Sequence, residues 1–156
     1  HRPGRGRQEV VAEGMDDLMT HMGHCCKPVP GDAIVGYITR GRGLTIHRRD
    51  CVNLRQLAAA EPARLMEVSW SEANPEAAYS VDLIIIAADR KGLLRDISAV
   101  FSEADLTLLG VNTSTDRTSD RATMRFTAEV KDMDQLETLQ TRLRQIPDVI
   151  GVTRPR

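Results

Sequence analysis

The stretch HCCKPVPGDAIVGYITRGRGLTIHRRDC, residues 24–51, contains the most unusual residues of this chain. All 3 cysteines lie in it, and His47 precedes Cys51 by four positions. Prolines, glycines and arginines separate short apolar groups, so buried hydrocarbon alone cannot close the segment. We therefore predict that something besides a hydrophobic core holds it together.

Length and composition favour small layered units of helices and strands. The chain has 156 residues, enough for one ordinary domain or two small ones, and is 41% hydrophobic but only 3% aromatic. Its net charge of −1 argues against a protein that binds polyanions over its whole surface. Between residues 40 and 55, however, five arginines face one acid, Asp50, so this stretch is locally basic.

The number of cysteines, the apolar runs and the start of the chain indicate the cellular compartment in which we expect the protein. No apolar run of about 18 residues could span a membrane, and the polar start HRPGRGRQ is unlike a signal peptide. We therefore expect a cytosolic protein, in which an odd number of cysteines favours thiols or metal ligands over disulfides. Because the chain begins without methionine, we expect it to be a piece of a longer protein.

Residues 9–71 are predicted to form a small β-rich module, after a lead over residues 1–8 that we expect to be disordered. A rigid turn at KPVPGD is followed by strands over residues 33–39 and 44–48, which form a hairpin with arginines at its tip. A short helix over residues 53–60 comes next, with Asp50 as its N-cap and with Leu54 and Leu57 facing inward. Leu65, Val68 and Trp70 indicate a closing strand.

A linker is predicted over residues 72–79, where small, acidic and turn residues show no periodicity. Residues 80–156 then predict the order β-α-β-β-α-β, which gives two helices on one face of a four-stranded antiparallel sheet, the ferredoxin-like arrangement. The fold class is therefore α+β. The first helix is predicted to bury Leu93, Leu94, Ile97, Val100, Phe101 and Ala104. The third strand is predicted to bury Ala122, Met124, Phe126, Ala128 and Val130. The second helix is predicted to bury Leu136, Leu139, Leu143 and Ile146.

Four motifs carry a resemblance to a known family. CCKPVPGDAIVGYITRGRGLTIHRRDC, MEVSW, ADRKGLLRDISAVF and PDVIGVTR closely resemble the C-terminal regulatory half of the long RelA/SpoT-type stringent-response enzymes, in the RelA branch. The resemblance covers nearly all of the chain after residue 9. It implies a zinc-finger or ribosome-inter-subunit module followed by an ACT domain. It also implies that the GTP pyrophosphokinase and hydrolase domains, which make or degrade (p)ppGpp, precede these modules and are absent here.

Cys25, Cys26, His47 and Cys51 are candidate metal ligands. Three thiolates and an imidazole match the ligand number and softness of a tetrahedral structural Zn²⁺ site, which would stabilise a module with a small core. The adjacency of Cys25 and Cys26 is an objection, because neighbouring side chains tend to point apart. The alternative is that Cys26 is a buried small hydrophobic residue and that His47 faces solvent from a strand.

The candidate RNA-binding residues are Arg40, Arg42, Arg48 and Arg49. Their guanidinium groups suit phosphates, and structured RNA is a natural partner because its shape and backbone can be recognised. The resemblance implies ribosomal RNA and the uncharged tRNA in the A site. The alternative is a solvated charged loop.

Asp89, Arg90, Gly92 and Leu93 form a candidate ligand loop between a strand and a helix, where glycine permits close approach and the helix offers free N–H groups. The ACT resemblance implies an amino acid bound there at a subunit interface; the alternatives are a purely structural turn, ribosome contact or homodimer formation. No catalytic motif is visible in the sequence. We therefore expect a regulatory region that binds RNA and self-associates, or else an amino-acid sensor that controls the catalytic half allosterically.

Overall fold

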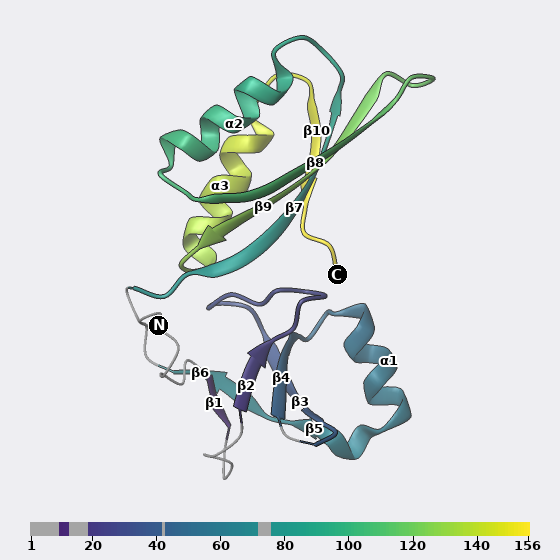
Figure 1. Cartoon of the computed structure of the whole chain (residues 1–156), viewed down its shortest axis with the longest axis vertical. Coiled ribbons are helices and arrows are strands. Elements are labelled where there is room, and N and C mark those ends of the chain that lie inside the picture. The colour runs from purple at the N-terminus through teal and green to yellow at the C-terminus, as the bar shows by residue number, and fades with distance from the viewer. Residues whose placement is uncertain (1–9, 13–18, 42, 72–75) are drawn as a thin grey trace. The chain divides into compact units, whose positions relative to one another are not determined.

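The computed structural model describes residues 10–12, 19–41, 43–71 and 76–156 (Figure 1). It divides into two compact units, with the boundary between Tyr79 and Ser80. Each unit has its own sheet and its own core, and each is described separately below. No helix within the described ranges is long and apolar enough to cross a lipid bilayer.

The first unit contains a four-stranded sheet and a two-stranded ribbon. Its elements are β1 (Val10–Ala12), β2 (Met19–Met22), β3 (Ile34–Thr39), β4 (Gly43–Arg48), α1 (Val52–Ala60), the 3-10 helix η1 (Pro62–Arg64), β5 (Leu65–Met66) and β6 (Val68–Trp70). The sheet order is β2-β4-β3-β5, and β1 pairs with β6. Strands β3 and β4 are antiparallel, as the predicted hairpin requires, whereas β2 runs parallel to β4.

Alternation along β3 places two small cores on opposite faces of this sheet. Ile34 belongs to a cluster with Leu44 and Ile46, against which the β1–β6 ribbon packs. The next residue along, Val35, belongs to a second cluster on the other face, and that cluster also contains Tyr37, Leu54, Cys26 and Cys51. The cysteines therefore lie on the α1 side of the sheet, inside a core that they help to build.

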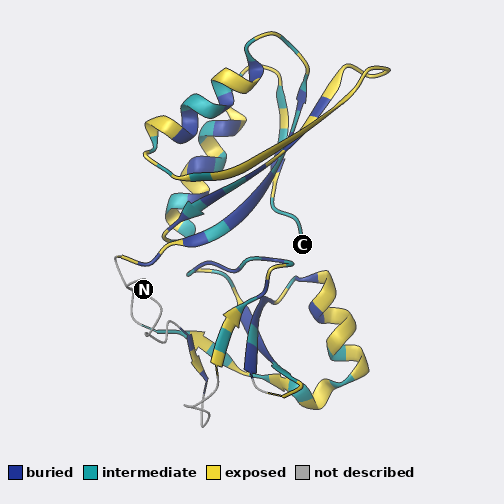
Figure 2. Ribbon diagram, in the orientation of Figure 1, coloured by how far each residue is buried: buried dark blue, intermediate teal, exposed yellow. Residues whose placement is uncertain are grey.

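Two details of the predicted helix are wrong. Cys51, not Asp50, is the N-cap of α1, because the Asp50 carboxylate accepts a hydrogen bond from Arg48 instead. Leu57 is 37% exposed, and only Leu54 is buried in α1. Figure 2 shows α1 as a largely exposed helix. The predicted closing strand is two short strands, since β5 pairs with β3 and β6 with β1.

The second unit has the predicted ferredoxin-like arrangement. Its elements are β7 (Tyr79–Ala88), α2 (Leu93–Glu103), β8 (Leu108–Asp116), β9 (Arg121–Val130), α3 (Met133–Arg144) and β10 (Val149–Thr153). The sheet order is β10-β7-β9-β8, and both helices lie on one face of it (Figure 1).

Its core consists of the faces that the periodicity predicts. The five residues predicted to be buried in β9 are all buried, and α3 buries Leu136, Leu139 and Leu143. Phe101 of α2 stacks on Phe126 of β9 with ring centroids 5.1 Å apart. Three predicted core positions are wrong: Leu94 is 47% exposed, and Ala104 and Ile146 lie beyond the ends of α2 and α3 and are only partly buried.

Candidate metal centre

The side chains of Cys25, Cys26, His47 and Cys51 converge in the first unit. Their four candidate ligand atoms all lie within 4.8 Å of one another. Cys25 Sγ is 3.5 Å from His47 Nδ1 and 3.5 Å from Cys51 Sγ, and Cys26 Sγ is 3.8 Å from His47 Nδ1. All three cysteines are free thiols.

These separations fit a tetrahedral metal ion. Bonds of about 2.3 Å to sulfur and about 2.0 Å to nitrogen, at tetrahedral angles, place the ligand atoms roughly 3.5–3.8 Å apart. The 3.5 Å and 3.8 Å contacts fall in this range. The donor set therefore fits Zn²⁺ with small side-chain adjustments, and His47 presents Nδ1 rather than Nε2 to the centre of the cluster.

A tight turn explains how two adjacent cysteines reach one point. The Lys27 N–H donates to the Gly23 carbonyl at 2.9 Å, and the Gly23 N–H donates to the Ile46 carbonyl of β4 at 2.8 Å. Lys27 has a φ of 49°, in the left-handed region. Within such a turn neighbouring side chains diverge by only about 100°, rather than pointing to opposite faces as in a strand. The turn therefore lets the side chains of Cys25 and Cys26 converge although the two residues are adjacent.

The other two ligands come from the end of β4 and the start of α1. His47 pairs with Val35 in the β3–β4 ladder and so shares the face on which Cys26 and Cys51 are buried. A turn closed by the Cys51 N–H and the Arg48 carbonyl, at 3.0 Å, then brings Cys51 back to His47. The His-x3-Cys spacing thus spans the end of a strand, a turn and a helix start.

Burial sets the protonation of the metal-free site. It lowers the pKa of His47, so the imidazole is neutral, which is the form that coordinates metals. Burial also raises the pKa of the Cys26 thiol to about 12 and, together with the neighbouring Cys51, raises that of Cys25. A bound dication would displace these thiol protons.

Arg48 lies against this cluster and is buried. It is 6% exposed, and its guanidinium donates to the Cys26 carbonyl at 3.2 Å and to Asp50 Oδ2 at 3.0 Å. The prediction that its guanidinium is presented to RNA phosphates is therefore wrong, because strand β4 ends with this side chain turned into the protein.

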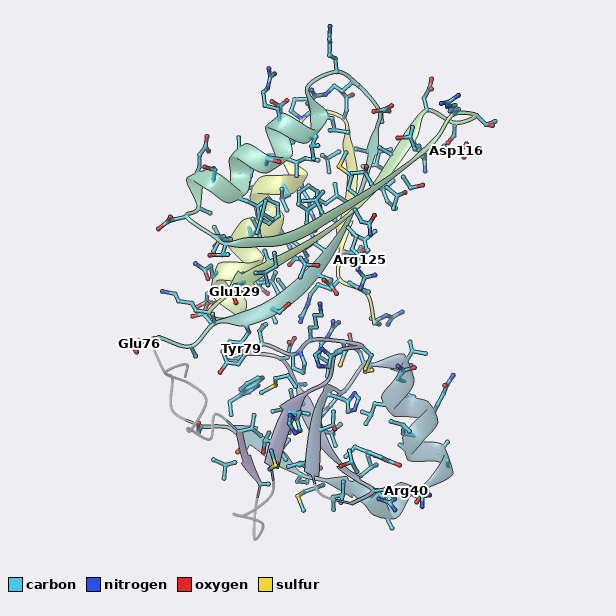
Figure 3. All side chains as sticks on the ribbon, in the orientation of Figure 1. Arg40, Glu76, Tyr79, Asp116, Arg125 and Glu129 are labelled. Carbon is cyan, nitrogen blue, oxygen red and sulfur yellow. The ribbon has the colours of Figure 1, made fainter. Side chains whose placement is uncertain are left out.

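Two of the remaining candidate RNA contacts, Arg40 and Arg49, are exposed and paired with acids. Arg40 lies at the end of the β3–β4 hairpin (Figure 3) and forms an ion pair of 2.8 Å with Glu61. The Arg64 guanidinium, helped by Arg40, holds the pKa of Glu61 below its usual range. Arg49 pairs with Glu67 at 3.1 Å. Arg42 lies outside the described residues.

The four residues of the candidate ligand loop line one pocket in the second unit. This pocket has a volume of about 360 Å³, and Asp89, Arg90, Gly92 and Leu93 line it together with side chains of β8 and β9. Gly92 is the N-cap of α2 with a φ of 81°. Arg90 is already engaged, since it pairs with Asp96 at 2.8 Å and with Asp148 at 2.9 Å.

Asp82 is a buried acid that sequence inspection did not single out. Its carboxylate accepts from Arg125 at 2.8 Å and from the Thr127 hydroxyl at 2.6 Å. The signal was an aspartate inside the otherwise apolar run VDLIII, which is typical of a satisfied buried carboxylate. It ties β7 to the neighbouring strand β9.

Protein-family models match both units. Residues 10–71 match the RelA/SpoT RIS domain, and residues 75–154 match the ACT domain. The chain belongs to the ACT-domain family, with a RelA/SpoT RIS domain ahead of the ACT domain. The resemblance to the regulatory region of RelA/SpoT enzymes is thereby confirmed, and the RIS domain contains all four candidate metal ligands.

Curated relatives agree with these matches. The GTP pyrophosphokinase of Haemophilus influenzae is 43% identical over 145 residues, which cover 93% of this chain and 19% of the relative. That of Escherichia coli K12 is 41% identical over the same length and coverage. The crystal structure of the ACT domain from the GTP pyrophosphokinase of Chlorobium tepidum is 24% identical, covers 50% of this chain and 99% of that chain, and superimposes with a TM-score of 0.45. The chain spans about a fifth of the length of the curated relatives, 19%.

Proposed function

We propose that this regulatory RIS–ACT region belongs to a (p)ppGpp-producing GTP pyrophosphokinase of the stringent response and brings that enzyme to the ribosome in the cytosol. In this proposal the RIS domain is held by Zn²⁺ and contacts ribosomal RNA and the uncharged tRNA in the A site. The observation that carries it is the convergence of four soft ligand atoms inside a RIS domain. Such a site gives a small β-rich module the rigidity that RNA recognition requires.

Zinc is the metal best suited to this donor set. Three sulfur ligands and one nitrogen ligand select a soft or borderline ion, and tetrahedral geometry without an open position is typical of structural zinc. Zinc quantification on protein purified without an affinity tag is expected to give about one ion per chain. A value near zero, with the circular dichroism of a folded protein, would overturn the metal centre.

The proposed RNA contacts are Arg40, Arg42 and Arg49. Arg40 and Arg49 flank opposite ends of β4, whose 6 residues span roughly 20 Å. They would therefore contact phosphates of different nucleotides. Their present partners, Glu61 and Glu67, form surface ion pairs, which are weak enough to be exchanged for phosphate.

Sedimentation with ribosomes that carry uncharged A-site tRNA tests this contact. The double substitution of Arg40 and Arg42 by alanine is expected to weaken association and to reduce the salt slope by roughly one unit per lost phosphate contact. Arg121→Ala, which removes an exposed arginine of the ACT domain, is the control. An unchanged salt slope in the double variant would contradict a phosphate-binding role for the hairpin tip.

An amino-acid-sensing ACT domain is the second candidate function. The pocket beside Gly92 supports it, because all four predicted loop residues line it. Its volume of about 360 Å³ suits a small metabolite. Calorimetric titration with a panel of amino acids separates the candidates, since saturable heat from one of them would favour the sensor.

Self-association as a homodimer is supported by the edge of the ACT sheet. Strand β8 is one of the two edge strands of this sheet, has 9 residues and exposes Leu109 and Val111. An exposed edge of this kind can pair with the same strand of a second copy. Analytical ultracentrifugation is expected to detect a dimer that Val111→Lys weakens, and a monomer at all concentrations would remove this proposal.

A further inference from the structure

We infer that Arg48 is a positioning residue of the metal centre, in which its buried side chain and backbone N–H hold Cys26 in place and offset the charge of the three thiolates. This inference rests on the proposed metal centre and goes beyond it, because Arg48 supplies no ligand atom. The burial and the contacts of Arg48 carry it, together with the charge that a loaded site would have.

The charge of a loaded site is negative. A dication with three thiolates and a neutral imidazole carries a net charge of −1. Cys26, His47 and Cys51 are 4%, 5% and 0% exposed, so water does little to stabilise that charge. Within the part of the chain that the structure describes, Arg48 is the one arginine or lysine classed as buried, and its main-chain N–H and side chain both reach Cys26.

The contacts of Arg48 join two sides of the cluster. Its N–H donates to Cys26 Sγ at 3.3 Å, which directs a dipole at the sulfur that would become a thiolate. Its guanidinium donates to the Cys26 carbonyl at 3.2 Å and so fixes the backbone of the cysteine turn. The same group donates to Asp50 at 3.0 Å, and Asp50 immediately precedes Cys51. Arg48 thus links the turn that carries Cys26 to the segment that carries Cys51.

A purely apolar side chain could fill this position without the cost of burying a cation. Burial of a guanidinium is unfavourable unless its donors are satisfied and an opposite charge lies near. Asp50 supplies one partner, but its side chain is 43% exposed and partly solvated. The thiolates of a loaded site supply the buried negative charge. Groups that orient metal ligands in this way typically change metal affinity by about 10–100-fold when they are removed.

Competition for zinc against a chromophoric chelator measures the affinity of each variant. Arg48→Met keeps the aliphatic volume and removes the charge, and we expect it to weaken zinc binding by about 10–100-fold. Arg48→Lys keeps the charge but loses the planar fork, and we expect it to restore part of the affinity. Arg55→Met is the matched control, because Arg55 is exposed on α1 in the same module and its loss leaves the affinity unchanged.

Cobalt substitution gives a second measurement that a purely structural role would not alter. The thiolate-to-cobalt absorption of Arg48→Met is expected to be weaker than that of the wild type, as Cys26 leaves its position. Equal zinc affinity and an unchanged cobalt spectrum in Arg48→Met would overturn the inference while leaving the metal centre intact. If the unsubstituted chain itself binds no zinc, the metal centre fails and the inference fails with it.

Asp50→Asn keeps the test decisive if Arg48→Met does not fold. This change leaves Arg48 buried beside Cys26 but removes its charged partner on the Cys51 side. We expect a smaller loss of zinc affinity, of about several-fold, since the contacts of Arg48 with Cys26 are kept and the contact with residue 50 is weakened. An affinity equal to that of the wild type in a folded Asp50→Asn protein would also overturn the inference.

Discussion

The role of an individual side chain depends on the face of the strand or turn from which it projects. The four metal-ligand candidates could be predicted from the sequence because soft donors are rare and the His-x3-Cys spacing is informative. The sequence could not show which of Arg48 and Arg49 is buried, since both are arginines of one basic stretch. The strand register decides between them: Arg48 closes the β3–β4 ladder opposite Ile34 and is buried, whereas Arg49 follows the strand and is exposed.

Cys26→Ser is expected to disrupt metal binding more than any change at Arg48. Serine keeps the size of the side chain but replaces a soft sulfur by a hard oxygen, which zinc in a thiolate site binds poorly. We expect the loss of zinc affinity to exceed the about 10–100-fold typical of residues that only orient ligands. His24→Ala, an exposed neighbour in the same turn, is the control. Equal zinc content in Cys26→Ser and the wild type would exclude Cys26 as a ligand.

The Arg90–Asp96 pair gives the ACT domain a pH-dependent contribution to stability. The Arg90 guanidinium holds the pKa of Asp96 below its ordinary value of 3.8. A carboxyl with a lowered pKa in the folded state stabilises that state above its unfolded pKa and loses this contribution as the pH falls through its folded pKa. We expect Asp96→Asn to destabilise the protein to urea at pH 6.5, and the difference from the wild type to shrink as the pH falls below 3.8 through the lowered pKa of Asp96. A difference that does not shrink as the carboxyl becomes protonated would contradict this role.

At the scale of the element, periodicity predicts the ACT domain better than the RIS domain. Strand β9 alternates apolar and polar residues over its whole length, and α2 and α3 carry continuous apolar stripes. The RIS elements are too short for such patterns, since β5 has 2 residues and β6 has 3. Their pairing depends on contacts between distant segments, such as β1 with β6, which no local pattern encodes.

Gly92 makes the turn from β7 into α2, and alanine there is expected to destabilise the ACT domain. Its φ of 81° lies in the left-handed region, which costs a residue with a Cβ about 1–2 kcal/mol. An added Cβ would also lie 3.0 Å from the guanidinium of Arg95. Gly110→Ala on β8 is the matched control, because a Cβ there meets nothing within 4 Å. Chemical denaturation measures both variants, and equal stability of Gly92→Ala and the wild type would contradict this account of the turn.

At the scale of the whole molecule, the two units differ in what stabilises them. The ACT domain has a core that includes the stacked Phe101 and Phe126, and the metal-ligand candidates found among the described residues lie outside that domain. In the RIS domain most of the buried apolar residues that the structure describes form two small clusters, and Cys26 and Cys51 are members of one of them. Loss of a metal ion should therefore affect the RIS domain and spare the ACT domain.

Removal of the metal ion is expected to unfold the RIS domain selectively. The chain has 1 tryptophan, Trp70, and its indole N–H donates to the Asp32 carbonyl within the first unit, so its fluorescence reports the unfolding of that unit. With a chelator present, the thermal transition seen by tryptophan fluorescence should move to lower temperature. In far-ultraviolet circular dichroism, the larger helical transition of α2 and α3 should stay in place while the contribution of α1 shifts with the RIS domain. Binding energy at a structural zinc site is folding energy, so a shift of many degrees is expected. If the protein is shown to contain zinc and the chelator leaves the temperature of the fluorescence transition unchanged, the ion does not stabilise the RIS fold.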